Sequence, residues 1–278
     1  FCASLFRARS HYNIRLSRYE ILLPSVGGYN PYKADLHIHS TLTDGVVNIK
    51  GRVEEAWCDG LDVIAATEHV SIRPVKDTEG QPTPESVRLK KSSAAVKAVT
   101  SATKVAETFG VVVIPGVELT GDAATQGHFN ALFTTDNSVI YDYDAMQSIR
   151  NADKQGALIM HNHPGWRHPT LDMTEFEKAV YAEGLVDGLE LMNGAYFYPR
   201  AFNTAKEHKL FMTSNTDVHA TTAQQYRENG HLRNMTIIFA KECTLESLRE
   251  ALEAHRTLCY SFGTIGGEEK LLKEFFEA

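Results

Sequence analysis

Strand-like and helix-like segments alternate along most of this chain, and that alternation limits its possible folds more than any other feature. Short apolar runs such as "LDVIAATEH", "VVVIPGVEL" and "DGLELMN" are typical of buried strands, whereas "NIKGRVEEAWCDG" and "TLESLREALEAH" have the apolar spacing of helices. Repeated strand–helix units imply a parallel sheet, and this many units predict either a closed barrel or a doubly wound sheet. The sequence shows no internal repeat that would indicate a second domain.

The composition is that of a globular protein large enough to form such a sheet. The 278 residues are 43% hydrophobic and 23% charged, and no run approaches the length of a membrane span. The formal net charge of -7 argues against long nucleic acid or an anionic lipid surface as a partner. The four cysteines (Cys2, Cys58, Cys243 and Cys259) are too scattered for a CxxC metal site and too few for a disulfide scaffold. We therefore expect these cysteines to be thiols and not disulfides. The sequence indicates no oligomeric state.

The beginning of the chain differs from the rest. Residues 1–33 are expected to be a lead-in, interrupted by prolines and glycines, and residues 34–278 to form one domain. The opening "FCASLF" is apolar and rich in small residues, as at the end of a secretory signal. It favours export, to the periplasm or the cell exterior, over a cytoplasmic location, with a stray hydrophobic end as the alternative.

Residues 34–40, "ADLHIHS", carry a polar side chain at every second position of an apolar stretch. In an extended chain Asp35, His37 and His39 point to one face, because successive side chains alternate. Burying three polar side chains on one face is costly unless a partner compensates them, and a metal ion is the obvious partner. The same spacing recurs in "NTDVH", which contains Asp217 and His219.

Most side chains that can bind metal lie near the C-terminal ends of the expected strands. They are His37 and His39, His69 in "ATEH", Glu118 in "PGVEL", His161 and His163 in "IMHNHPG", and Asp217 and His219. In parallel α/β barrels this end of the strands carries the active site. His128 begins "HFNALF" instead, so we expect that segment to run antiparallel or to start at the site. Histidines and carboxylates without cysteine favour zinc, manganese or iron.

Taken in order, these motifs resemble those of the PHP (polymerase and histidinol phosphatase) family of metal-dependent phosphoesterases. "DLHIHSTLTDG" resembles the opening motif of the family through Asp44, and "GVEL", "HPG" and "TDVH" resemble its later motifs. "TEH" stands where the family has "TDH", with Glu68 in place of Asp. The resemblance covers residues 34–220. It implies a distorted (β/α)7 barrel, with residues 34–278 as a single PHP-like domain and a metal site at the C-terminal ends of the strands.

The resemblance also implies two or three divalent metal ions and their ligands. One ion would be held by His37, His39, Glu118 and Asp217, a second by Glu118, His128 and His163, and a third by Asp44, His69 and His219. The "HP" pairing of the family favours His163 over His161. Asp35 would then accept a hydrogen bond that fixes a ligating His ring. The alternative for Asp44 is that it caps the helix expected to begin near Asn48.

The function implied is hydrolysis of a phosphoester, by a phosphatase or a phosphodiesterase. Two ions that share a carboxylate can acidify a bridging water, and the resulting hydroxide would be the nucleophile. Catalysis would then depend on Glu118, Asp217 and Asp35. Arg73 and Arg167 directly follow ligand motifs, and we expect them to bind the phosphate of a small phosphorylated substrate, with Lys76 and Arg200 as further candidates. The alternative for each cation is a solvated loop residue.

Two other functions stay open on the sequence. An amidohydrolase-like enzyme would use the metals to cleave a C–N or carboxylic ester bond, but that class usually carries a carbamylated Lys, and no Lys ends a motif strand here. A non-catalytic metal-binding module would have lost ligands, whereas every motif in this chain is complete. No motif selects one substrate.

Overall fold

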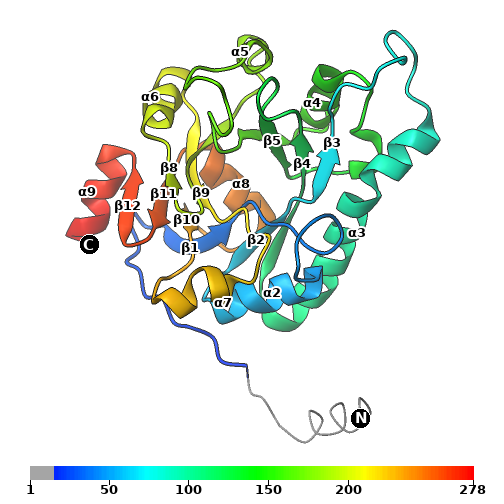
Figure 1. The fold of residues 1–278 in the computed structure, drawn as a ribbon. Helices are drawn as coiled ribbons and strands as arrows, with labels where there is room; N and C mark the ends of the chain where they lie inside the picture. The colour runs from blue at the N-terminus through cyan, green and yellow to red at the C-terminus, as the bar shows by residue number, and fades with distance from the viewer. Residues whose placement is uncertain (1–15) are drawn as a thin grey trace, which may run out of the picture.

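The computed structural model describes residues 16–278, so the expected signal-like segment and Cys2 lie outside the described residues. In this part of the chain, twelve strands form one continuous, strongly curled sheet (Figure 1). The strands are β1 (Asn30–Asp35), β2 (Val63–Ala66), β3 (His69–Ser71), β4 (Val112–Thr120), β5 (His128–Leu132), β6 (Leu158–His161), β7 (Gly188–Asn193), β8 (Tyr196–Phe197), β9 (Phe211–Asn215), β10 (Met235–Ala240), β11 (Thr257–Ser261) and β12 (Thr264–Gly267).

Helices surround this sheet. They are α2 (Ile49–Cys58), α3 (Glu85–Phe109), α4 (Ala145–Asp153), α5 (Glu175–Ala182), α6 (Pro199–His208), α7 (Thr222–Gln225), α8 (Leu245–Glu253) and α9 (Glu269–Glu277), with short 3-10 helices η1 (Asn137–Val139) and η2 (Arg227–Asn229). Within residues 16–278, no helix combines the length and the apolar character that crossing a bilayer requires.

Seven of the strands form a distorted barrel, as predicted. Their order is β1, β2, β4, β5, β6, β7 and β9, and β5 runs antiparallel to both of its neighbours while the other pairs are parallel. The segments that follow β1 and β9 close the ring, because Ile38 and Val218 form a parallel bridge. The amide of Asp217 also donates to the carbonyl of His37 (2.9 Å). The C-terminal ends of distant parallel strands therefore meet.

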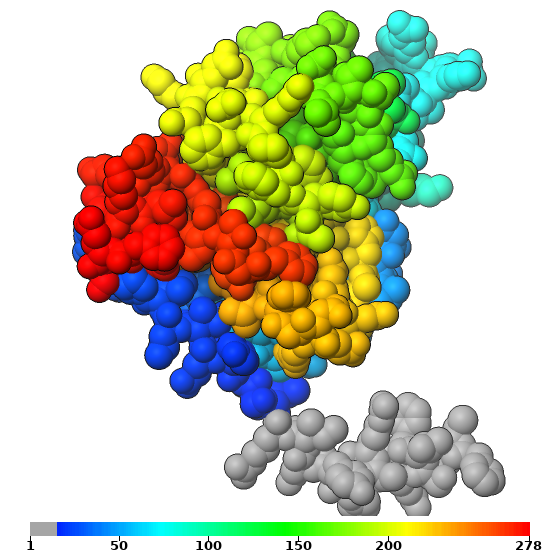
Figure 2. All heavy atoms as spheres, turned by 60° about the vertical axis from the view of Figure 1, so that its left-hand side comes forward, coloured from blue at the N-terminus to red at the C-terminus, as the bar shows by residue number. Residues whose placement is uncertain are grey.

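Beyond the barrel, the sheet continues as an antiparallel extension. β10 pairs with β1, and β11 and β12 follow it in order. Figure 2 shows the resulting arrangement, with the C-terminal elements beside the first described part of the chain. Of these C-terminal elements, α8 was predicted from the helical spacing of "TLESLREALEAH". This extension lengthens the sheet on the side of β1.

The barrel wall is apolar because its strands are covered on both faces. All four residues of β2 are buried, as the sequence "VIAA" suggests for a central parallel strand. Helix α3 presents Ala95, Ala98, Ala102 and Ala106, at helical spacing, to the barrel. In β7, a Cβ at Gly188 would come within 2.1 Å of the Phe211 ring, so only glycine fits there. This packing leaves one end of the barrel for polar side chains.

Candidate metal centre

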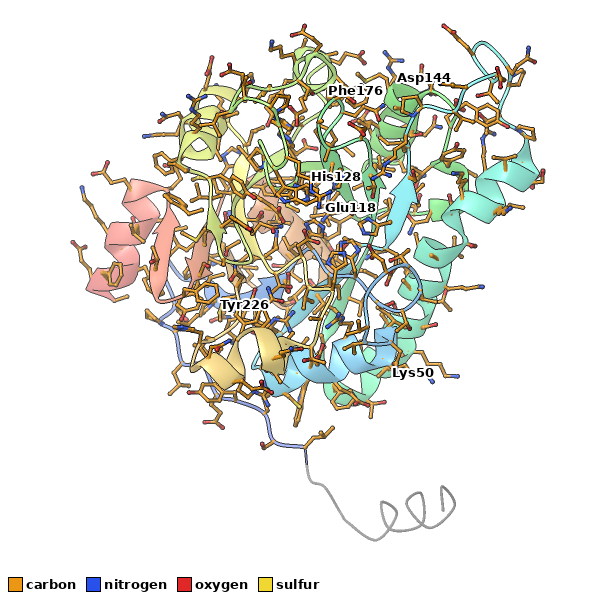
Figure 3. All side chains as sticks on the ribbon, viewed as in Figure 1. Lys50, Glu118, His128, Asp144, Phe176 and Tyr226 are labelled. Atoms are coloured by element: carbon orange, nitrogen blue, oxygen red, sulfur yellow. The ribbon has the colours of Figure 1, made fainter. Side chains whose placement is uncertain are left out.

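All nine predicted metal ligands come together at the C-terminal ends of the barrel strands. Figure 3 shows Glu118 and His128 in the middle of the molecule, where β4 and β5 meet. The side chains form four overlapping groups in which ligand atoms lie within 4.8 Å of one another: His37, His39 and Glu118; His37, His163 and Asp217; Glu118, His128 and His163; and His39, Asp44, His69 and His219. The close approach of loops around Ile38 and Val218 produces this convergence.

The inner cluster consists of His37, Glu118, His128, His163 and Asp217. Nε2 of His37 is 3.5 Å from a Glu118 oxygen and 3.3 Å from an Asp217 oxygen. Nδ1 of His128 is 3.0 Å from Glu118, and Nε2 of His163 is 3.8 Å from both Glu118 and Asp217. Glu118 therefore lies between ligand groups, as a bridging carboxylate would.

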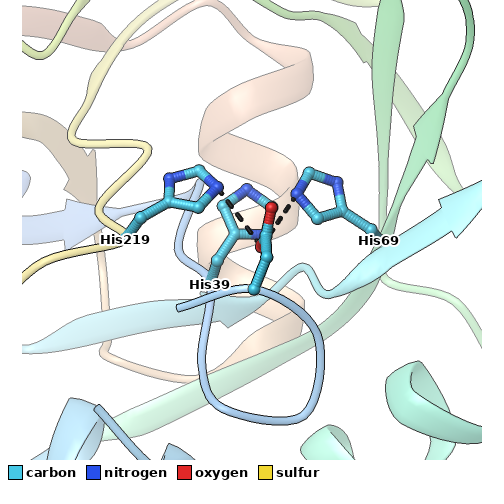
Figure 4. Close-up of side chains that lie close together, drawn as sticks. His39, His69 and His219 are labelled. Carbon is cyan, nitrogen blue, oxygen red and sulfur yellow. Dashed lines mark ion pairs between the residues drawn. The ribbon is translucent and has the colours of Figure 1, made fainter. Parts of the chain in front are cut away.

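The outer cluster consists of Asp44, His69 and His219 (Figure 4). One Asp44 oxygen is 3.2 Å from Nε2 of His69 and 3.3 Å from Nε2 of His219. His39 joins the two clusters, since its ring stacks on His69 (4.0 Å between centroids) and on His219 (4.4 Å), and its Nε2 is 3.0 Å from Asp217. His39 thus reaches both clusters, whereas the sequence assigned it to one ion.

The carboxylates perturb the titration of the surrounding rings. Burial lowers the pKa of His37, but Asp217 and Glu190 outweigh burial and raise that pKa well above its usual value. Burial likewise lowers the pKa of His69, yet Glu118 and Asp44 bring it to about 9. The pKa of Glu118 is well below its usual value, because the effect of His69 and His128 exceeds that of burial. The carboxylates therefore make these clusters favourable places for positive charge.

Comparison with solved structures decides the family. The chain is 34% identical to a two-domain protein from Bacteroides vulgatus described as containing a predicted PHP-like metal-dependent phosphoesterase. The alignment covers 95% of this chain and 74% of that one, with a TM-score of 0.81. The chain belongs to the PHP-like metal-dependent phosphoesterase family.

The chain is also similar in structure to the lesion-specific endonuclease PfuEndoQ from Pyrococcus furiosus. It is 18% identical, with a TM-score of 0.50, and the alignment covers 81% of this chain and 56% of that one, a likeness of fold alone. No family model matches this chain, and no curated protein matches it.

The donor set of this PHP-like chain fits bound cations. Nδ1 of His37 donates to the Glu190 carboxylate (2.9 Å), so Nε2 turns its lone pair toward Nε2 of His39, only 3.1 Å away. Nδ1 of His219 likewise donates to the Asp217 carbonyl (2.8 Å), leaving Nε2 directed at the outer cluster. Among the described residues, buried Nε2 of His128 has no hydrogen-bond partner. Lone pairs that face one another between carboxylates are the arrangement that a cation completes.

Glu190 is a buried residue of this PHP-like site that the sequence analysis missed. Its carboxylate also accepts the backbone N–H of His163 (2.7 Å) and the side-chain amides of Asn193 (2.8 Å) and Asn215 (2.9 Å). Burial would raise the pKa of Glu190, but His37 and His163 lower it, so the group stays ionised. The acidic residue in the middle of the apolar run "GLELMN" was the available signal.

The hydrogen bonds around Asp35, α2 and His161 bear on roles that were considered from the sequence. Asp35 accepts from the His37 backbone, Thr216 and Arg233, whereas Glu190, not Asp35, is the acceptor of the His37 ring. Asn48 caps α2 through its own side chain, so Asp44 does not have that role. The ring of His161 is directed away from the clusters and bonds Glu177 (2.9 Å) and the Tyr181 hydroxyl (3.0 Å).

A cavity of about 590 Å³ opens over the clusters, a size typical of small-molecule sites. Arg73, Trp166, Arg167 and Tyr196 contribute to its lining together with cluster residues. The Arg167 guanidinium stacks on the Trp166 ring, 4.4 Å from its centroid. Of the four predicted phosphate-binding cations, Arg73 and Arg167 thus reach the cavity. Lys76 lines a neighbouring hollow, and Arg200 lies outside the cavity in an exposed pair with Asp172 (3.1 Å).

Proposed function

We propose that this chain is a metal-dependent hydrolase of a small phosphoester. The observation that carries the proposal is the convergence of nine His and carboxylate ligands on a cavity that also contains two arginines. By the motif assignment, the first ion is held by His37, His39, Glu118 and Asp217, the second by Glu118, His128 and His163, and the third by Asp44, His69 and His219. Zinc, manganese and iron are the candidate metals for such ligands.

When bound, the ions supply positive charge for phosphate oxygens and lower the pKa of the water that serves as nucleophile. The residues of the chain prepare that chemistry. Glu190 holds the proton of His37 on Nδ1, which keeps Nε2 available as a ligand atom. Neither Arg73 nor Arg167 has a carboxylate partner among the described residues, so both guanidinium groups are available to bind phosphate oxygens.

The cavity favours a small substrate over long nucleic acid. The chain as a whole carries a net charge of -7, which repels a polyanion at long range. At short range the two arginines are enough for one phosphate group. A phosphate bound between them would direct the ester into the remaining volume of the cavity.

The test is a panel of three chromogenic substrates with protein loaded separately with zinc, manganese or iron(II), and with metal-stripped protein. We expect p-nitrophenyl phosphate, its bis-ester, or both to be hydrolysed only with metal. Hydrolysis of p-nitrophenyl acetate alone would support the amidohydrolase-like alternative, and bound metal with no turnover of any substrate would support a binding module. Glu118→Gln should abolish phosphoester hydrolysis, and Glu107→Gln, at an exposed position on α3, is its matched control.

A further inference from the structure

The segment between β6 and α5 supplies both a predicted metal ligand and part of the cavity wall. His163, Trp166 and Arg167 all belong to it, and the Trp166 ring lies 5.1 Å from the His163 ring. Two consecutive turns shape the segment, closed by Trp166 N–H to the His163 carbonyl (3.0 Å) and His168 N–H to the Gly165 carbonyl (3.2 Å). Its form therefore decides where Trp166 and Arg167 stand relative to the metal ligands.

This backbone is strained and needs to be held. His163 (φ 26°), Gly165 (φ 86°) and Arg167 (φ 59°) all have positive φ angles within five residues. For residues other than glycine such angles cost free energy, and they persist only where surrounding contacts impose them. Contacts from residues outside 163–167 must therefore hold this backbone conformation.

Glu177, in the first turn of α5, contacts the chain just before and just after the strained residues 163–167. One carboxylate oxygen accepts from Nε2 of His161 (2.9 Å), just before the segment, and lies 3.3 Å from Nε2 of His168, just after Arg167. The other oxygen accepts the backbone N–H of Thr174 (2.7 Å). Burial would raise the pKa of Glu177, but the hydrogen bond from His161 lowers it, consistent with an ionised acceptor. The carboxylate is 0% exposed and the His168 ring 3% exposed, so water does not compete strongly for these contacts.

His168 is itself fixed from its other side. Its Nδ1 lies 3.1 Å from the Asp172 carbonyl while Nε2 faces the Glu177 carboxylate, so the ring lies between two acceptor groups. His163, by contrast, has an independent anchor, because its backbone N–H donates to Glu190 (2.7 Å). Loss of His168 would therefore release residues 164–167 without releasing the metal ligand.

We propose that Glu177 and His168 are positioning residues that hold Trp166 and Arg167 against the substrate. They act through the loop, since among the described residues neither belongs to the ligand groups or to the lining of the cavity. The proposal rests on the proposed function for its kinetic consequence, in that Arg167 binds the phosphate. Its structural part, the fixing of the loop, is independent of catalysis.

The structural part is tested by fluorescence. The two tryptophans of the chain are Trp57 and Trp166, and Trp57 packs beside Phe109 on the helical side of the barrel, so a Trp57→Phe background reports on Trp166 alone. In that background, loaded with zinc, His168→Ala should raise the acrylamide quenching constant of Trp166 about twofold. His168→Gln, which keeps a side-chain N–H donor toward Glu177, should restore much of the parental value. His231→Ala, at an exposed histidine outside the loop, should leave quenching unchanged.

The kinetic part is tested with p-nitrophenyl phosphate. His168→Ala should raise KM about tenfold with kcat changed much less, and metal content should equal that of the parent. Because His168 acts through Arg167, adding His168→Ala to Arg167→Ala should raise KM no further. If His168→Ala does not fold, Glu177→Gln, which leaves donors unpaired, serves as the test variant and should raise KM more than His168→Gln does.

Unchanged Trp166 quenching in folded His168→Ala would overturn the proposal, as would additive effects of the two substitutions on KM. If the parent hydrolyses no phosphoester, the proposed function fails, while the quenching measurement still decides whether the loop is held in this way. The two failures are therefore distinguishable.

Discussion

The inner and outer clusters are built from the same residue types, but the protein surrounds them differently. In the inner cluster the side chains of His37 and Glu118 are 0% and 1% exposed, and Glu190 holds His37 from behind. In the outer cluster the side chains of Asp44 and His219 are 55% and 40% exposed. Buried and hydrogen-bonded ligands are pre-organised, whereas exposed ligands must be ordered when the ion binds. We therefore expect a tightly held inner pair of ions and a more readily exchanged outer ion.

The two clusters also differ in the backbone elements to which their ligands belong. The inner ligands come from or directly follow barrel strands β4, β5, β6 and β9, with the segment after β1. Asp44 comes instead from the loop of residues 40–47, in which Gly45 approaches the His39 carbonyl so closely that a Cβ would lie 2.7 Å from its oxygen. That loop is joined to the barrel by the Thr43 hydroxyl, which donates to buried Glu68. The Val46 amide of the same loop also donates to the His219 carbonyl (2.8 Å). These loop contacts are a weaker support than a barrel wall.

Among the substitutions that compare the two clusters, the largest effect is expected at Asp217, the inner carboxylate that also lies 3.0 Å from His39. Asp217→Asn should lower kcat/KM for a phosphoester by about 10³, or roughly 4 kcal/mol of transition-state stabilisation, and deplete metal. Asparagine tolerates the positive φ of this position (51°), so circular dichroism should show an intact fold. Asp172→Asn, at an exposed residue, is the control. Wild-type turnover in a folded Asp217→Asn protein would contradict the assignment of the inner cluster.

The next prediction tests whether the hydrogen bonds that Glu190 accepts from His37 and its neighbours increase the metal affinity of the inner cluster. Glu190→Gln offers one acceptor oxygen where the carboxylate serves the His37 ring, the His163 backbone and two amides. Metal affinity of the inner sites should fall about 10- to 100-fold, as measured by competition with a chromogenic chelator. Glu207→Gln, at an exposed position on α6, should have no effect. Equal affinities for Glu190→Gln and parent would show that Glu190 serves folding alone.

Asp44→Asn probes the outer cluster. Because the substitution removes the only carboxylate of the outer cluster, the protein should bind one ion fewer per chain and lose about tenfold in kcat, ~1.4 kcal/mol. Inductively coupled plasma mass spectrometry gives the count and steady-state kinetics the rate. Full metal content with the full rate would make the functional site binuclear, formed by the inner cluster alone.

The smallest effect is expected at Thr43. Thr43→Val keeps the shape of the side chain and removes the hydroxyl that binds Glu68. The outer ion should bind about fivefold more weakly, ~1 kcal/mol, while the inner ions are unaffected. A uniform loss from all sites, measured by calorimetric titration, would mean that the two clusters are not independently supported.

Much of this arrangement was predictable from short-range patterns. The parallel strand–helix units imply that strand ends meet. They therefore predicted that His69, Glu118, His163 and Asp217 lie close together. His128 at the beginning of its expected strand left two alternatives, an antiparallel strand or a strand that starts at the site. β5 is antiparallel, and His128 belongs to the ligand groups. These predictions succeed because side-chain alternation and strand direction are local properties.

The parts that could not be predicted depend on long-range pairing. Alternation placed Asp35 on the face of His37, but regular pairing of β1 ends at Asp35, and its carboxylate instead meets Arg233, 198 residues away. Whether Arg200 reaches the cavity depends on where α6 packs and on the pairing of Arg200 with Asp172, and neither is a local property of the sequence. Side-chain alternation did not separate His161 from His163, whereas the family resemblance favoured His163. In the structure, Glu177 and Tyr181 occupy the His161 ring.

The central claim is that the clusters bind metal ions of unequal stability that are required for phosphoester hydrolysis. Stepwise chelation of the loaded protein, with metal content and p-nitrophenyl phosphate hydrolysis measured on the same samples, tests it most directly. The account predicts that one ion leaves first with a partial loss of rate, that the remaining ions leave together with the rest of the activity, and that added metal restores both. Hydrolysis that persists in ion-free protein, or fully loaded protein that hydrolyses no phosphoester, would contradict it.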